Sequence, residues 1–165
     1  MTPLLRTTRG TAALAAVTAV VLGSLAACGW GGAEPASRLA AGWSQGNYRD
    51  LHEGPDNPGL RTRLVNDEGQ RRELLGLLPT AIPAAERAKV QSVDLAQEVI
   101  VVGVYPNCAS TSHVTAQEGS LRLVVERDEG TMCTWAPTQV DVWAVSREGL
   151  SAPIVLRDQR GAPTT

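Results

Sequence analysis

Phenylalanine is absent from this 165-residue sequence, and four tryptophans and two tyrosines are its only large aromatic residues. Aromatic side chains bury large areas in protein cores, so this core has to be built mainly from valine, leucine and isoleucine. A small domain with few aromatic residues buries less apolar surface per residue and gains from a covalent cross-link. Because the core has no phenylalanine, we expect the domain to depend on a covalent cross-link between cysteines.

Histidine is also scarce, since His52 and His113 are the only two. The sequence has no Gly-x-Ser-x-Gly elbow, phosphate-binding loop, dinucleotide fingerprint or calcium loop. Nucleophilic catalysis needs a serine or cysteine beside a base, and the serines at 110 and 112 have only His113 nearby in the sequence. We therefore expect no enzyme and no cofactor. An envelope hydrolase that brings His52 and His113 to a serine is the most distant alternative.

An excess of basic residues is missing, because 15 lysines and arginines stand against 17 acidic residues and form no basic stripe. Nucleic-acid-binding proteins usually carry a basic patch, so we expect no nucleic-acid partner. Asp128 and Glu129 are expected in a solvated turn. Lys89 is the single lysine, and this preference for arginine is typical of high-GC genomes such as those of actinobacteria.

The N-terminal apolar run, residues 12–22, is far shorter than the roughly 20 apolar residues that span a bilayer. It follows Arg6 and Arg9, and no acidic residue precedes Glu34. The run is followed by Leu25-Ala26-Ala27-Cys28. A short basic region before an apolar region of this length predicts an export signal.

The tetrapeptide that ends in Cys28 resembles the lipobox of bacterial lipoprotein precursors. The resemblance implies that residues 1–27 are removed and that Cys28 carries a diacylglyceryl group. Two acyl chains, palmitate among them, would anchor the chain to the outer, extracytoplasmic face of the cell membrane. Loss of Arg6 and Arg9 would leave 13 basic and 17 acidic residues, a net charge near −4. The alternative is an ordinary signal peptide cleaved at this Ala-x-Ala-like site, with Cys28 incidental.

Two irregular stretches follow the leader. Residues 28–42 are rich in glycine, alanine, proline and serine without apolar periodicity, which predicts a flexible tether. Residues 43–165 have the length of one domain. Within them, residues 44–59 contain several turn signals, and Trp43 and Tyr48 are expected to hold this stretch against the domain surface.

The chain from residue 60 onward predicts helices first and then strands. The expected helices cover residues 68–78, capped by Asn66 or Asp67, and residues 83–89. The expected strands cover residues 60–65, 99–105, 112–116, 121–126, 138–145 and 154–156. In the fifth of these strands Val140, Val142 and Ala144 share one face, and Asp141, Trp143 and Val145 share the other. We predict a small α+β domain, an antiparallel β-sheet or sandwich with one or two short helices.

Cys108 and Cys133 are the cysteines that remain beside Cys28, an even number in an exported domain. We predict a disulfide between them that clamps the ends of two strands. The alternative is a metal site formed by Cys108, His113 and Cys133, which lacks a fourth ligand and is disfavoured outside the cell. We expect no metal, and we expect His113 in a loop.

The order of these elements resembles a small domain of bacterial envelope proteins, the PrcB C-terminal type. The matching features are residues 60–65, 71–78, 99–104, 121–126 and 140–145. The glycine-tyrosine pair of that type is replaced here by Asn107-Cys108-Ala109-Ser110. The resemblance implies a protein-binding accessory domain without chemistry of its own.

Trp135 and Trp143 are the candidate interaction residues, because exposed indoles are enriched at binding hot spots. The alternative is that both fill a core that has no phenylalanine. Gly103, inside the valine-rich run, marks either a bulge that lets a ligand approach or a plain strand irregularity.

The expected function is a non-enzymatic, membrane-anchored module that binds an envelope protein or stabilises a complex. A small-ligand-binding lipoprotein is the first alternative, and an apolar pocket of several hundred cubic ångströms would favour it. An exposed apolar patch without a deep cavity would favour the interaction module.

Overall fold

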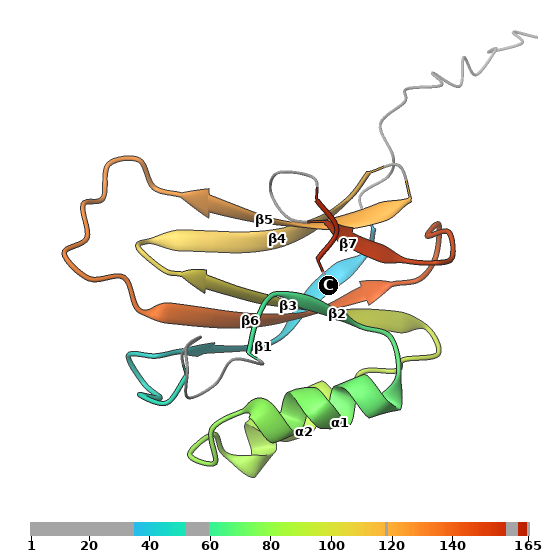
Figure 1. Ribbon diagram of the computed structural model, residues 1–165, viewed down its shortest axis with the longest axis horizontal. Helices are drawn as coiled ribbons and strands as arrows, with labels where there is room; N and C mark the ends of the chain where they lie inside the picture. Colours follow the sequence, from blue (N-terminus) through green and yellow to red (C-terminus); the bar gives the residue numbers. More distant parts are fainter. Residues whose placement is uncertain (1–34, 52–59, 118, 158–161, 165) are drawn as a thin grey trace, which may run out of the picture. The chain divides into compact units, whose positions relative to one another are not determined.

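The computed structural model describes residues 35–51, 60–117, 119–157 and 162–164. In these ranges the chain forms two helices and seven strands (Figure 1). They are β1 (Ser37–Ser44), β2 (Arg63–Val65), α1 (Glu68–Leu77), α2 (Ala84–Gln91), β3 (Glu98–Pro106), β4 (Ser110–Gln117), β5 (Ser120–Arg127), β6 (Thr138–Ser146) and β7 (Val155–Arg157). The predicted α+β class is confirmed. Neither helix is long and apolar enough to cross a membrane.

The strands form two sheets. The first has the order β1-β6-β3-β2 and is antiparallel throughout. The second has the order β4-β5-β7, with β4 and β5 antiparallel. β7 pairs with β5 in parallel, although an antiparallel edge strand was expected. β7 follows β6, which lies in the other sheet, so no hairpin turn dictates its direction.

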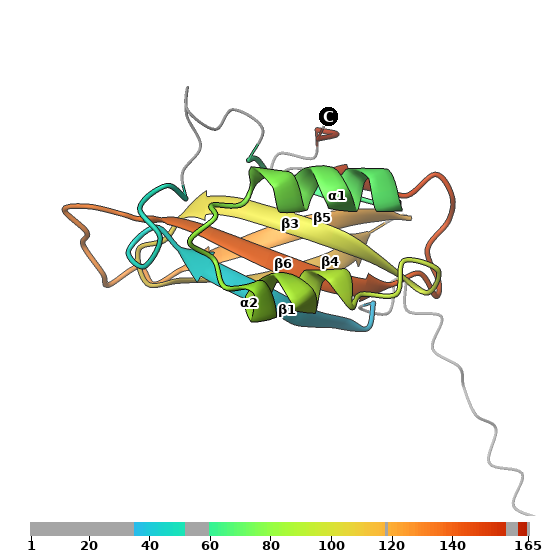
Figure 2. The same cartoon turned by 90° about the horizontal axis from the view of Figure 1, so that it is seen from below.

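The sheets and helices make three layers (Figure 1). α1 and α2 cover one face of the four-stranded sheet (Figure 2), and the three-stranded sheet packs on its other face. β6 contributes to both interfaces, since Val142 and Ala144 pack in the cluster below the helices and Trp143 and Val145 pack between the sheets. This alternation is the one predicted for residues 138–145.

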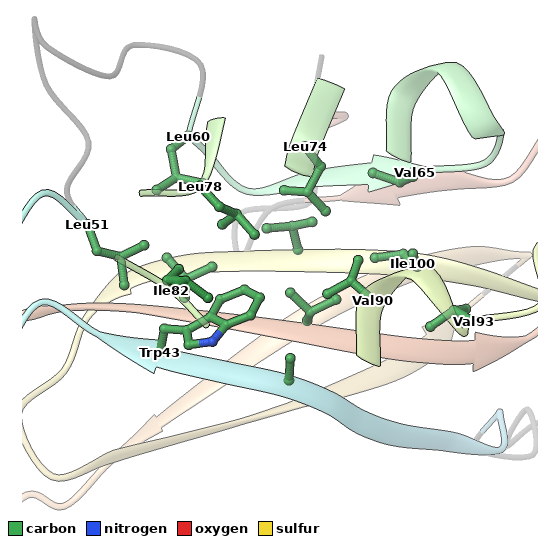
Figure 3. Packing of buried hydrophobic residues seen from close by; sticks show 14 of the residues in the cluster. Trp43, Leu51, Leu60, Val65, Leu74, Leu78, Ile82, Val90, Val93 and Ile100 are labelled. Carbon is green, nitrogen blue, oxygen red and sulfur yellow. The ribbon is translucent and has the colours of Figure 1, made fainter. Parts of the chain in front are cut away.

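The predicted flexible tether over residues 28–42 is wrong for the residues that form β1. Residues 37–42 do not form a flexible linker, because they pair with β6 as an edge strand of the first sheet. Trp43, expected to hold the following stretch against the domain, is only 3 % exposed and packs among Leu51, Ile82 and their neighbours (Figure 3). A register shift between Leu39 and Ala41 breaks the alternation of side chains, so the sequence shows no strand period here. Residues 1–34, with Cys28, and residues 52–59, with His52, lie outside the described ranges.

Local sequence signals explain both helices and the short β2. Asp67 caps α1 by accepting a hydrogen bond from the Gln70 main-chain N–H (2.9 Å), as predicted. α2 begins directly after Pro83. β2 is shorter than the predicted residues 60–65, because the Thr62 hydroxyl replaces a main-chain partner. Its Oγ1 accepts from the Val104 N–H (3.0 Å) and donates to the Val104 carbonyl (3.2 Å).

Gly103 lies in an unbroken register between β3 and β6, so it does not mark a bulge. A Cβ atom at this position would lie 2.6 Å from Leu123 Cδ2 on β5. The glycine therefore lets the two sheets approach each other closely at this point.

Arg87 joins the two helices. Its guanidinium donates to four main-chain oxygens, those of Leu75 (2.7 Å), Leu78 (2.9 Å), Pro79 (2.5 Å) and Ile82 (3.2 Å). These carbonyls lie at the C-terminal end of α1 and in the following turn, where no helical N–H is available to them. A single planar cation thus stabilises the connection between α1 and α2.

We predict that Arg87→Ala lowers the free energy of unfolding by about 2–4 kcal/mol, because it leaves partly buried carbonyl oxygens without donors. Arg87→Lys should recover only part of this loss, since an ammonium group lacks the planar fork of donors. Urea denaturation measures both variants. Arg72→Ala is the control, because Arg72 is exposed and makes one long bond to the Glu68 carbonyl (3.3 Å). Equal losses in Arg87→Ala and Arg72→Ala would contradict the assignment.

Candidate functional site

Cys108 and Cys133 lie next to each other, with Cα atoms 5.9 Å apart and sulfur atoms at bonding distance. Cys108 lies between β3 and β4, and Cys133 lies between β5 and β6. Each of these connections carries the chain from one sheet to the other. The predicted pairing thus clamps the two places where the chain crosses between the sheets.

The alternative metal site is not favoured by this geometry. The two cysteine sulfurs are at bonding distance from each other. No group of three or more metal-binding side chains occurs in the described parts of the chain. His113 lies within β4, in agreement with the expected strand over residues 112–116, so the separate expectation of a loop position for His113 is wrong. Its Nδ1 is 4.0 Å from Glu126 Oε1.

The loop between β5 and β6, residues 128–137, is held by several bonds besides the disulfide. The Asp128 carboxylate accepts from the Gly130 N–H (3.0 Å) and from Thr131 Oγ1 (2.8 Å). These two bonds lower the pKa of Asp128, so its carboxylate is charged at neutral pH. At the other end, the Pro137 carbonyl accepts from the Asn107 N–H (2.8 Å). Both ends of the loop are therefore fixed to the body of the domain.

Two large apolar side chains of this loop face solvent. Met132 is 98 % exposed and Trp135 is 64 % exposed. They flank Cys133, so the disulfide fixes the main chain between them. We call Met132, Trp135 and the main chain between them the apolar tip. The predicted interaction residue Trp135 belongs to it.

Trp143, the second candidate, lies elsewhere. It is partly buried in the cluster between the sheets, and its Nε1 donates to Ser112 Oγ (3.0 Å). Its neighbours across the sheet are Leu39 and Val101, away from the start of β6. The structure therefore does not bring the two tryptophans together, and one fills the core while the other is exposed.

A buried polar network centred on Asp141 was not expected from the sequence. Asp141 is 6 % exposed, and its Oδ2 accepts from Tyr105 Oη (2.6 Å) and Ser112 Oγ (2.5 Å). Its Oδ1 accepts from Gln139 Nε2 (2.8 Å). Ser112 lies on β4 and Asp141 on β6, so the network ties the two sheets together. The Trp143 indole extends it through Ser112.

One of two flanking glycines, Gly42, makes room for this carboxylate. Gly42 on β1 and Gly103 on β3 are the residues paired with Asp141 on either side. A Cβ atom at Gly42 would lie 3.1 Å from Asp141 Oδ1. Among the described residues, no histidine takes part in the arrangement, because His113 follows Ser112 in the strand and projects to the opposite face. A serine whose hydroxyl donates to Asp141 and accepts from an indole is suited to structural support.

Burial raises the pKa of Tyr105, and the hydrogen bond to Asp141 raises it further. In the unfolded chain a tyrosine titrates near its usual pKa of about 10. Above that pH the unfolded chain loses a proton that the folded chain retains, so deprotonation favours unfolding. The stabilisation from Tyr105 is thus complete below about pH 10 and is lost as the pH rises further.

We predict that the wild-type chain loses more stability between about pH 8 and pH 11 than Tyr105→Phe does. Urea denaturation at both pH values measures this difference. Tyr48→Phe is the matched control and should behave as the wild type. An identical pH dependence for wild type and Tyr105→Phe would contradict the role of Tyr105.

The main sequence signals found the disulfide and Trp135 but missed Met132 and the Asp141 network. Met132 had no signal, because a lone methionine in a polar turn looks like any turn residue. Asp141 had a weak one, since it is a charged residue on a strand face shared with Trp143 and Val145. A charge on a face that packs against a second sheet has to find partners.

A scan against protein-family models finds no match for this chain, and searches of the curated proteins and of the solved structures find none either.

Proposed function

We propose that this chain is a lipid-anchored, extracytoplasmic module that binds an envelope protein and has no catalytic role. The observation that supports it best is the apolar tip, with Met132 and Trp135 exposed on a loop that is fixed at both ends. Tryptophan is among the residues most enriched at binding hot spots. Two exposed apolar side chains of this size on one fixed loop support a contact surface for another protein at this place.

The rigidity of the loop supports binding. A flexible loop loses conformational entropy when a partner orders it, and that loss weakens the complex. Here the disulfide and the turn at Asp128 already order the main chain before any partner arrives. The binding free energy of Met132 and Trp135 is therefore largely available for association.

The proposed location at the membrane is based on the N-terminal residues 1–28. The lipobox-like sequence before Cys28 supports lipid attachment there, and the intact mass of the membrane-extracted protein tests it. We expect loss of residues 1–27, a diacylglyceryl adduct on Cys28, and alkylation of Cys108 and Cys133 only after reduction. An unlipidated mass would overturn the anchor and leave a secreted module.

Site-specific photo-crosslinking tests the interaction. A benzophenone amino acid at position 132 in the full chain should give a protein adduct in intact cells. The same probe at position 39 is the control, because Leu39 is also exposed (51 %) but lies on β1. The additional change Trp135→Ala should reduce the adduct at position 132. Equal adducts at both positions, or none at either, would contradict a specific interaction at the tip.

A small-ligand-binding role is the second candidate. A hollow of about 400 Å³ lies between β2 and β7, with Leu64, Ile154 and Leu156 among its lining residues. Arg63 binds Glu73 through Nη1 (2.7 Å), but its Nη2 has no hydrogen-bond partner in the described structure. Decanoate, an apolar carboxylate, should raise the melting temperature of the wild type but not of Arg63→Met if this hollow binds such ligands. No shift would leave the interaction module as the better proposal.

A further inference from the structure

The apolar tip lies at one end of the first sheet, and the chain enters that sheet at the other. β1 and β6 are antiparallel, with Ser37 opposite Val145 and Ser44 opposite Gln139. The tip immediately precedes β6, so it lies near the C-terminal end of β1. Along a strand of this length the two ends are separated by about 25 Å. The apolar tip and the point at which the chain enters the first sheet thus lie at opposite ends of β1.

The surroundings of the tip are acidic. A hollow of about 870 Å³ lies beside the loop, and Asp128 and Glu129 contribute to its lining. Arg127 is its only cation, and Pro106 and Val125 supply apolar surface. The Asp128 carboxylate keeps its charge because the turn donates two hydrogen bonds to it. The hollow thus has a mainly polar lining with a net negative charge and some apolar surface from Pro106 and Val125.

We propose that the partner is an envelope protein with an apolar pocket bordered by a basic side chain. The pocket receives Met132 and Trp135, and the lysine or arginine enters the acidic hollow beside them. This inference rests on the proposed function and adds the chemistry of the partner. Complementary charges at the border of an apolar contact set the orientation of a complex and its association rate.

A membrane surface fits the tip less well. Loops and helices that bind anionic lipid headgroups combine tryptophan with lysine or arginine, because the cations attract the headgroups. Here the exposed tryptophan is combined with Asp128 and Glu129, which anionic headgroups repel.

A second copy of this chain also fits poorly. A symmetric dimer places the same patch of both copies face to face. Two acidic hollows would then meet, and like charges across an interface disfavour the complex. The net charge near −4 that is expected after loss of Arg6 and Arg9 adds to the repulsion between two copies of the chain.

Charge reversal beside the tip tests the proposal. With the benzophenone probe at position 132, Glu129→Lys should lower the yield of the protein adduct by about fivefold in membrane preparations at low salt. Glu129 makes no hydrogen bond in the described structure, so its replacement leaves the loop intact. Glu148→Lys is the control, since it makes the same change on an exposed residue beyond the other end of β6. Added salt should lower the wild-type yield toward that of Glu129→Lys.

The outcomes separate the possibilities. Equal adduct yields for Glu129→Lys and Glu148→Lys would overturn the basic partner and leave the proposed interaction standing. Lipid adducts at position 132, which report contact of the tip itself with the bilayer, would overturn a protein partner. An adduct of twice the chain mass would identify a second copy instead. No adduct in the wild type would overturn the proposed function itself.

Discussion

Asp141→Ala is expected to lower the free energy of unfolding by about 3–5 kcal/mol, a large part of the roughly 5–15 kcal/mol available to a domain of this kind. The substitution removes the acceptor of three hydrogen bonds, from Tyr105, Ser112 and Gln139. Their donors stay between the sheets with no replacement, and each buried donor without an acceptor costs about 1–3 kcal/mol. Urea denaturation with the disulfide intact measures the loss.

Two further variants separate the network from simple packing. Asp141→Asn keeps one acceptor oxygen and nearly the same volume, so it should cost less than Asp141→Ala. Tyr105→Phe should destabilise the wild type more than it destabilises Asp141→Ala, because the Tyr105 hydroxyl has already lost its partner there. A loss below about 1 kcal/mol for Asp141→Ala would show that water replaces the carboxylate. Additive effects of the two substitutions would show that Tyr105 and Asp141 do not act together.

Replacing both Cys108 and Cys133 by serine is expected to cost about 3–4 kcal/mol, since the bond closes a segment with a sequence separation of 25 residues. The cross-link restricts the unfolded chain, and this restriction is lost in the variant. The tip is affected as well, because residues 128–137 then depend on their hydrogen bonds alone. We therefore expect weaker crosslinking from position 132 in a chain that is still folded.

Denaturation with and without a reducing agent tests this expectation. Reduction should destabilise the wild type to the level of the double serine variant and should leave that variant unchanged. The same comparison tests the alternative in which the two thiols bind a metal. A reducing agent would then leave the metal site of the wild type intact and would not destabilise it, whereas the double serine variant would still be less stable. If the reduced wild type and the double serine variant both crosslink from position 132 as well as the oxidised wild type does, the disulfide contributes stability but does not order the tip.

Local patterns predicted β6 and not β1, for a physical reason. The β6 side chains alternate between two buried interfaces, and every second residue is apolar on the face toward the helices. β1 is an edge strand whose alternation is interrupted between Leu39 and Ala41, and its small residues resemble a linker. Its pairing depends on β6, which lies about a hundred residues further along the chain. The tether prediction was therefore wrong where tertiary contacts determine the strand.

The sequence by itself determined the α+β class, the start of a helix after Asn66 or Asp67, most of the strands and the pairing of Cys108 with Cys133. These depend on neighbouring residues or on counting cysteines. Only the tertiary structure decided that Trp135 is exposed while Trp143 is partly buried, and that Asp141 has partners on both sheets. Tyr105 meets Asp141, 36 residues further along the chain, because β3 pairs with β6. Ser112 meets Asp141, 29 residues further along, because β4 packs over β6. Contacts of this kind arise from the packing of distant elements, and a local pattern does not encode them.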